Sequence, residues 1–230
     1  MSENIKKITK AFVVDLDSRE NQNIILSTRP FNHQAHQVNE VTKKIYKLIK
    51  DAKHPNDDII LNHNEIKEAF FSPFKPQLKN AQVFLSHFHA DKNKVLKVKG
   101  YLESKTKHEV FVDSLFWDYK DDVLNKLAEY DDISGIEDAF TLILREPLEY
   151  MIKKCPYFVF LQSKNSVSLN QDLLGITYSA WIYEELKIAH SLIADNTLQA
   201  RIKAMRVSHN ITNLLRRFKL ISLDSLSNLL

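Results

Sequence analysis

The sequence predicts an α/β fold in which a parallel sheet is flanked by helices, preceded by an N-terminal α+β extension. From residue 80 onward, short runs rich in Val, Ile and Phe alternate with stretches of helical periodicity, as in parallel α/β proteins. Residues 157–161 form a near-continuous apolar run after Pro156, which is typical of a central strand covered on both faces. The first strands end in polar residues, and ligands of doubly wound folds bind at that edge of the sheet.

The elements expected beyond residue 80 follow a strand and helix alternation. The first strand covers residues 81–86, and Asp91 can cap a helix that runs to about Ser104. The second strand covers residues 109–113. The remaining elements are a mostly helical stretch at 120–154 interrupted around 131–135, the strand at 157–161, a polar loop at 162–178, a helix from Ser179, an amphipathic stretch at 198–215 and a weak strand at 219–223.

The N-terminal residues 1–79 differ from the rest and are expected to form an added module of unknown role, with the sheet domain at 80–230. The prolines Pro73 and Pro76 interrupt the pattern and suggest the boundary. The elements expected in the module are strands at 10–16 and 23–27 that could form a hairpin, a helix at 35–49, a strand at 59–61 and a helical turn at 65–71.

Composition and charge narrow the classes of partner. The 32 basic and 29 acidic residues are interspersed along the 230-residue chain, so no basic stripe indicates a nucleic acid partner. Only three glycines occur, which argues against the glycine-rich phosphate loops of classical dinucleotide sites. The single cysteine, Cys155, fits a reducing compartment and is expected to pack in the core. Since no apolar run is long enough to span a membrane, we expect a cytoplasmic protein without a membrane partner.

Glu185 is misplaced for a purely structural helix. With one residue about every 100°, the apolar side chains of the helix from Ser179 fall within one arc, and Glu185 lies near its centre. Glu184 and Lys187 lie outside the arc. A carboxylate aimed at a core must find partners, shift its pKa or face a cleft, because burying it ionised and unpaired is costly. The alternatives are therefore a cleft and a rim position where Glu185 pairs with a lysine.

The segment His87-x-His89-x-Asp91 also resembles the metal signature His-x-His-x-Asp-His of metallo-β-lactamase-fold hydrolases, in which imidazoles and an aspartate hold zinc. Lys92 stands where the closing histidine belongs, and its ammonium group would repel a metal ion. We therefore favour a reading without a bound metal.

A second resemblance accounts for more of the chain. Val83–Lys92 resembles the opening strand and loop of Toll/interleukin-1 receptor (TIR) domains, where a hydrophobic strand runs into Ser-His and an aspartate starts the first helix. Val110–Asp113 is similar to the second strand of that family. Phe158–Leu161, with Ser163 and Ser166 after it, resembles the central strand and the serine-bearing loop. The spacing Ser179-x-Trp181-x-x-x-Glu185-Leu186 is similar to the helix start of the family.

These matches occur in the family's order over residues 81 to about 190. Three departures accompany them: residues 120–150 are longer than in a minimal TIR domain, the usual glycine after the second strand is absent, and the last strand is indistinct. The resemblance implies a flavodoxin-like fold and either an NAD-cleaving enzyme or a non-enzymatic adaptor.

In the enzymatic members of this family the glutamate four residues after the tryptophan is catalytic, and this implies that Glu185 is the catalytic residue. Further residues expected at the substrate site are Ser86, His87, Phe88, Asp113, Trp117 and Trp181. His87 could contact a phosphate or ribose or merely cap the adjacent helix, and each aromatic residue could equally pack in the core.

The resemblance also implies NAD as substrate with no separate cofactor. It further implies self-association through the TIR domain, a possible downstream effector protein and a role in bacterial antiphage defence.

Overall fold

The computed structural model describes residues 10–29, 38–51, 62–129, 134–169, 175–177, 179–193 and 209–230. The chain divides into two compact units. We call residues 1–32, 80–114 and 151–230 the sheet unit and residues 33–79 and 115–150 the helical unit.

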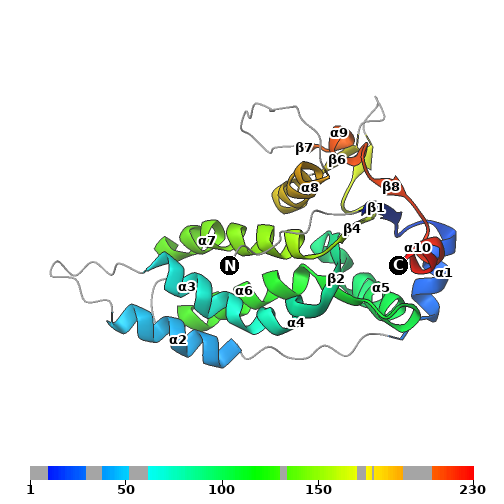
Figure 1. The fold of residues 1–230 in the computed structure, drawn as a ribbon. Helices are drawn as coiled ribbons and strands as arrows, with labels where there is room; N and C mark the ends of the chain where they lie inside the picture. Colours follow the sequence, from blue (N-terminus) through cyan, green and yellow to red (C-terminus); the bar gives the residue numbers. More distant parts are fainter. Residues whose placement is uncertain are drawn as a thin grey trace. The chain divides into compact units, whose positions relative to one another are not determined.

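A five-stranded parallel sheet forms the centre of the sheet unit (Figure 1). Its strand order is β3-β2-β4-β1-β8, and every pairing is parallel. The predicted α/β fold with a flavodoxin-like parallel sheet flanked by helices is confirmed, as is the central position of the apolar strand β4. The strands are β1 (Lys10–Asp15), β2 (Ala81–His87), β3 (Glu109–Val112), β4 (Tyr157–Gln162) and β8 (Lys219–Leu220).

Strand β1 corrects the expected domain boundary at residue 79. It lies inside the sheet, where Lys10 aligns with Tyr157 of β4 and Phe12 with Lys219 of β8. Asn21, in the helix after β1, also connects this segment to the rest of the unit. Its side chain donates to the Asp15 carbonyl at 2.7 Å and accepts from the Leu223 N–H at 2.8 Å. Residues 10–29 are therefore part of the sheet unit and not of a separate N-terminal module.

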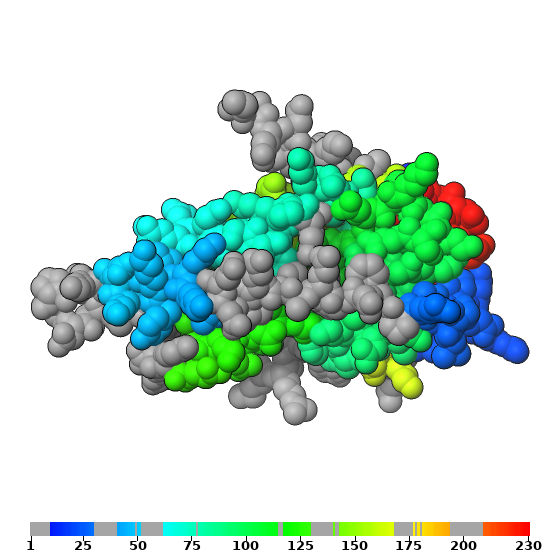
Figure 2. Space-filling view, turned by 90° about the horizontal axis from the view of Figure 1, so that it is seen from below, coloured from blue at the N-terminus to red at the C-terminus, as the bar shows by residue number. Residues whose placement is uncertain are grey.

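Helices cover the sheet. Helices α1 (Arg19–Ser27), α5 (Lys92–Lys105) and α10 (Leu223–Leu229) contact one another, and Figure 2 shows α1 in blue and α10 in red as neighbours beside green residues of the chain. The other elements of the sheet unit are η2 (His89–Asp91), α8 (Ala180–Leu192), α9 (Thr212–Leu215), and a small antiparallel sheet of β5 (Ser168–Leu169), β6 (Gly175–Thr177) and β7 (His209–Asn210).

The expected hairpin is wrong, because residues 23–27 belong to helix α1. Ser18 caps that helix by accepting from the Asn21 N–H, and Ile25 turns into the core while Leu26 remains exposed. The short apolar run of residues 23–27 resembles a strand when it is considered alone. A cap and one buried position per turn are nevertheless sufficient to stabilise it as a helix.

The helical unit contains the expected helices at 35–49 and 65–71, observed as α2 and α3, while the expected strand at 59–61 lies outside the described residues. Pro73 and Pro76 do not end the helical pattern, since each lies in the first turn of a new helix, where no N–H donor is needed. The helices are α2 (Val38–Asp51), α3 (His63–Phe71), η1 (Ser72–Phe74), α4 (Lys75–Asn80), α6 (Ser114–Ala128) and α7 (Ser134–Lys154).

Aromatic side chains fill the core beneath the sheet's central strands. Phe84 on β2 stacks on Phe111 of β3 at 5.7 Å and on Phe158 of β4 at 5.5 Å between ring centroids. Cys155 is buried beside β2, where burial raises the pKa of its thiol to about 12. Replacement of a buried phenylalanine by alanine typically lowers the free energy of unfolding by about 3–5 kcal/mol. This packing fixes the position of β2 in the core, and with it the position of the polar residues at the carboxyl end of the strand.

Among the described helices, none combines the length and the apolar character that a bilayer crossing requires.

Candidate functional site

The site is formed at the carboxyl end of β2. Ser86, near the end of that strand, donates a hydrogen bond of 2.5 Å from its hydroxyl to Oε2 of Glu185 on α8. Ser179 caps α8 by accepting from the Ile182 N–H at 3.3 Å, which sets the start of the helix. Glu185 has no exposed surface, and its neighbours on the same helix face, Ile182 and Leu186, are buried with it. The predicted position of Glu185 on the apolar face is therefore confirmed.

Asp113 and His87 lie beside this pair. Asp113 follows β3 directly, and its Oδ1 lies 2.5 Å from Nδ1 of His87, the last residue of β2. The same oxygen accepts from the Ser114 N–H at 2.8 Å, at the first residue of α6. Both His87 and Asp113 are 4% exposed. Because β2 and β3 are parallel neighbours, their carboxyl ends bring the two side chains to one edge of the sheet.

The electrostatics of the site centre on two buried carboxyl groups. Burial raises the pKa of Asp113 to about 7, against the opposing effect of hydrogen bonds from Glu185 and the Ser114 N–H. Burial also raises the pKa of Glu185 well above its usual range, and the neighbouring charge of Asp113 raises it further, while the Ser86 hydroxyl opposes both effects. Like charges held close in a low dielectric disfavour double ionisation. Burial and the neighbouring charge thus favour the neutral form of the Glu185 carboxyl group.

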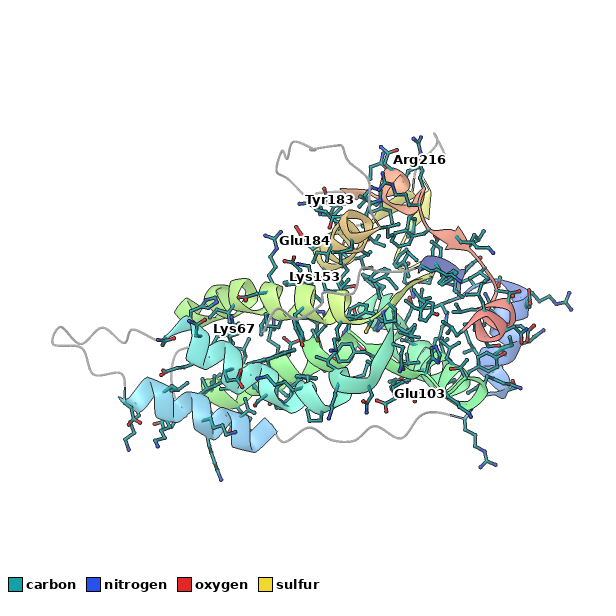
Figure 3. All side chains as sticks on the ribbon, in the orientation of Figure 1. Lys67, Glu103, Lys153, Tyr183, Glu184 and Arg216 are labelled. Atoms are coloured by element: carbon teal, nitrogen blue, oxygen red, sulfur yellow. The ribbon has the colours of Figure 1, made fainter. Side chains whose placement is uncertain are left out.

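The side of α8 that carries Tyr183, Glu184 and Lys187, which we call its outer side, differs from the buried side in its polar contacts. Glu184 lies 3.6 Å from Lys187, and Tyr183 stacks on His209 of β7 at 4.3 Å between ring centroids. Figure 3 shows Tyr183 and Glu184 along this helix. The two adjacent glutamates thus differ in environment: Glu184 is partly exposed and close to a lysine, whereas Glu185 is enclosed with a hydroxyl and a second carboxyl group.

Asp91 does not act as the predicted helix cap. It lies at the position before α5, but its side chain makes no capping hydrogen bond. Instead its carboxylate accepts from the Ser163 hydroxyl and, at 2.9 Å, from the Asn165 side chain, both in the loop after β4. Lys94 lies 3.9 Å away and also donates to Asp17. We call Asp91, Ser163 and Asn165 the loop clasp.

The sequence pattern missed the loop clasp, although Ser163 and Asn165 carry a signal for it. Both follow an apolar strand in a parallel sheet, as Asp113 does after β3, so they reach the same edge. Ser163 is 2% exposed, and its hydroxyl also accepts from the Asn165 and Ser166 N–H groups. The clasp therefore holds the loop after β4 against η2, the turn that follows β2.

The structure brings Ser86, His87, Asp113 and Glu185 together, but not all the expected substrate residues. Phe88 lies just after β2 and Trp181 one turn before Glu185, each partly exposed. Trp117, also expected at the substrate site, lies within helix α6, in the helical unit. Helix α6 begins at Ser114, directly after Asp113.

The expected metal signature is split by the fold. His87 is buried against Asp113, whereas His89 begins the turn η2 and is exposed. Within the described ranges, no group of at least three His, Cys, Asp or Glu side chains is arranged to hold a metal ion.

No protein-family model, curated protein or solved structure matches this chain, so the residues of the site are the basis for any functional conclusion.

Proposed function

We propose that this chain is an NAD-cleaving enzyme of the TIR kind, with Glu185 as its catalytic residue. The observation that supports the proposal most is the enclosed position of Glu185 at the carboxyl end of β2, where Ser86 donates to it and Asp113 adjoins it. This edge of a parallel α/β sheet is where ligands of doubly wound folds bind. Groups with strongly shifted pKa values also cluster at functional sites.

The chemistry requires one carboxylate near the ribose. Cleavage of the bond between nicotinamide and ribose passes through a transition state in which positive charge develops on the sugar. An ionised Glu185 would stabilise that charge, and nicotinamide leaves without a general acid. Phe88 and Trp181 could pack against the substrate beside Glu185, since both lie partly exposed next to the site.

The proposal includes an opening step. Glu185 has no exposed surface, so NAD can reach it only when α8 or the loop after β4 moves away from the end of β2. We further propose that self-association of the chain promotes this opening and that activity serves bacterial defence signalling, as the TIR resemblance implies.

Nicotinamide release from NAD by the purified full-length chain tests the proposal. Glu185→Gln keeps the shape and removes the charge, so we expect release to fall by about 10²-fold or more. Glu184→Gln is the matched control because it changes the adjacent carboxyl group on the outer side of α8, and it should leave the rate unchanged. Protein concentration is varied and assembly is measured in parallel. Equal rates for the wild type and Glu185→Gln would refute the assignment.

The complete burial of Glu185 favours a second candidate, a TIR-like interaction module without catalysis. In that case the hydrogen bond between Ser86 and Glu185 only fastens α8 to the sheet. The two candidates give different results in the same assay. An adaptor releases no nicotinamide at any protein concentration, even where self-association is complete, whereas the enzyme releases it in proportion to the assembled fraction.

A further inference from the structure

We propose that the pocket between helices α1 and α5 docks an acidic segment of a partner protein, with one aromatic or leucine side chain of that segment inserted into the pocket. The two helices contact each other, and every residue that lines the pocket belongs to the sheet unit. Glu185 and its neighbours at the strand ends are not part of the lining. The inference therefore stands independently of the proposed NAD cleavage.

The α1 side of the pocket is apolar. Leu16, directly after β1, has no exposed surface, and Ile25 on α1 is 5% exposed. Leu26, which also lines the pocket, is 74% exposed. Leu26 thus continues the apolar lining out to the protein surface. An apolar patch that is bordered by polar residues marks an interaction site, whereas a single leucine scattered on a surface does not.

The size of the pocket limits what can enter it. Its volume is about 170 Å³. An apolar cavity of about 150 Å³ accepts one benzene molecule, whereas sites for drug-sized ligands measure about 300–1,000 Å³. The pocket therefore suits one bulky side chain and not a whole cofactor. Single side chains inserted into such pockets supply most of the binding energy at protein interfaces.

The α5 side of the pocket is basic. Lys94 and Lys97 lie one turn apart on α5, and the lining contains no acidic side chain among the described residues. Nζ of Lys94 lies 3.1 Å from Oδ1 of Asp17 and 3.9 Å from Oδ1 of Asp91, so this lysine is already paired. Lys97 forms no ion pair within the part of the chain that the structure describes. A carboxylate beside the inserted side chain would pair with Lys97, and a basic segment would be repelled.

A second copy of the chain matches this charge poorly. Elsewhere among the described residues, the exposed large apolar side chains are Tyr46, Tyr150 and Leu220. Tyr46 lies among the lysines of α2, and Leu220 follows Lys219, so both would bring positive charge. One turn before Tyr150, Glu146 is already paired with Lys67. The occupant that the charges favour is therefore a different protein.

The test is binding of the peptide Ac-Glu-Glu-Phe-Glu-Glu-amide to the full-length ¹⁵N-labelled chain, followed by NMR. We expect saturable shifts of the Leu26, Asn93 and Lys97 amide signals, since these residues line the pocket. Salt should weaken the binding because it screens the attraction between the charges. Alanine in place of the peptide's phenylalanine should weaken binding by about tenfold or more, as the loss of an interface anchor does. Lysine in place of the four glutamates should abolish it.

Two variants of the chain locate the binding. Leu26→Glu and Lys97→Glu each place a like charge against the acidic peptide and should weaken binding by about tenfold. Leu26 is exposed and Lys97 is partly exposed, so both variants should keep the fold, which urea denaturation checks. Leu220→Glu and Lys105→Glu make the same changes at exposed residues outside the lining and should leave binding unchanged.

Three results would overturn the inference. The first is the absence of saturable shifts, or shifts that Leu26→Glu and Lys97→Glu leave unchanged. The second is binding of toluene at the same residues together with equal binding of the acidic and basic peptides, which would identify a cavity for a small apolar ligand. The third is a concentration-dependent shift of Leu26 and Lys97 without peptide, accompanied by dimers in sedimentation, which would identify a contact between two copies.

Discussion

Ser86 on β2 and Glu185 on α8 are joined by a hydrogen bond of 2.5 Å between residues that lie 99 positions apart in the sequence. The bond links the end of a central strand to the middle of a helix, and both partners are fully buried. A hydroxyl in such a place both stabilises the fold and favours the ionised form of the carboxyl group it meets.

We expect Ser86→Ala to reduce the free energy of unfolding by about 1–3 kcal/mol, because it removes the donor to a buried carboxyl group. The loss of the hydroxyl should also raise the pKa of Glu185 further, since the hydrogen bond opposes the effect of burial. Urea denaturation measures the first effect, and ¹³C NMR the second. Ser104→Ala, at an exposed serine on α5, is the control and should change neither quantity appreciably. A neutral result for Ser86→Ala would show that the hydrogen bond is not maintained in solution.

Glu185→Gln should be more stable than the wild type, and the difference should grow as pH rises. A carboxyl group with a raised pKa binds more protons in the folded than in the unfolded chain, so its contribution to stability falls with rising pH. The decline begins near the unfolded-state pKa of about 4.3. It continues until Glu185 ionises in the folded chain, and Glu185→Gln removes this contribution.

Thermal unfolding of Glu185→Gln, Glu184→Gln and the wild type between about pH 5 and pH 8 measures this difference. Glu184→Gln should follow the wild-type curve. A large loss of stability in Glu185→Gln at neutral pH would instead identify Glu185 as an ionised partner in a structural ion pair.

The loop clasp yields a prediction for Asp91. Asp91→Ala removes the acceptor of Ser163 and Asn165, so it should reduce the free energy of unfolding by about 2–3 kcal/mol, the scale of hydrogen bonds to a charged group. Asp224→Ala, at an exposed aspartate on α10, should cost much less. Equal effects of the two changes in urea denaturation would mean that the clasp does not hold the loop after β4.

Removal of residues 1–32 should abolish cooperative folding of the sheet unit. Without β1, the strand β4 loses one neighbour, and β8 loses its one neighbour among the described strands. The backbone groups that face β1 are then left without partners. Far-UV circular dichroism and urea denaturation of the truncated chain measure the loss, and a peptide of residues 1–32 added in trans should restore part of the structure. Cooperative unfolding of the truncated chain would contradict this prediction and support a domain boundary at residue 79.

The features that the sequence predicted correctly depend on local patterns. The apolar run of β4 and the position of Glu185 on a helix face follow from the burial of alternating or periodic side chains. The meeting of His87 and Asp113 follows from a rule of parallel sheets, in which polar residues at the carboxyl ends of neighbouring strands share an edge.

The features that the sequence did not predict depend on partners far along the chain. The apolar strand β1 would fit beside any strand of the sheet, and only its packing selects β4 and β8. The sequence around Asp91 is typical of a helix cap, but its carboxylate instead accepts hydrogen bonds from side chains in the loop after β4. The sequence pattern indicates no element at residues 114–119, yet the periodic burial of Tyr119, Val123 and Leu127 keeps that segment helical.

The place of β1 between β4 and β8 has a consequence for the order of folding. Both neighbours of β1 lie far along the chain, and Asn21 finds its Leu223 partner 202 positions later. Contacts of such long sequence separation slow folding, because the entropy of closing the loop is lost before the strands pair. We therefore expect the pairing of β1 to form late, and the apolar side chains of this strand are open to aggregation until it does.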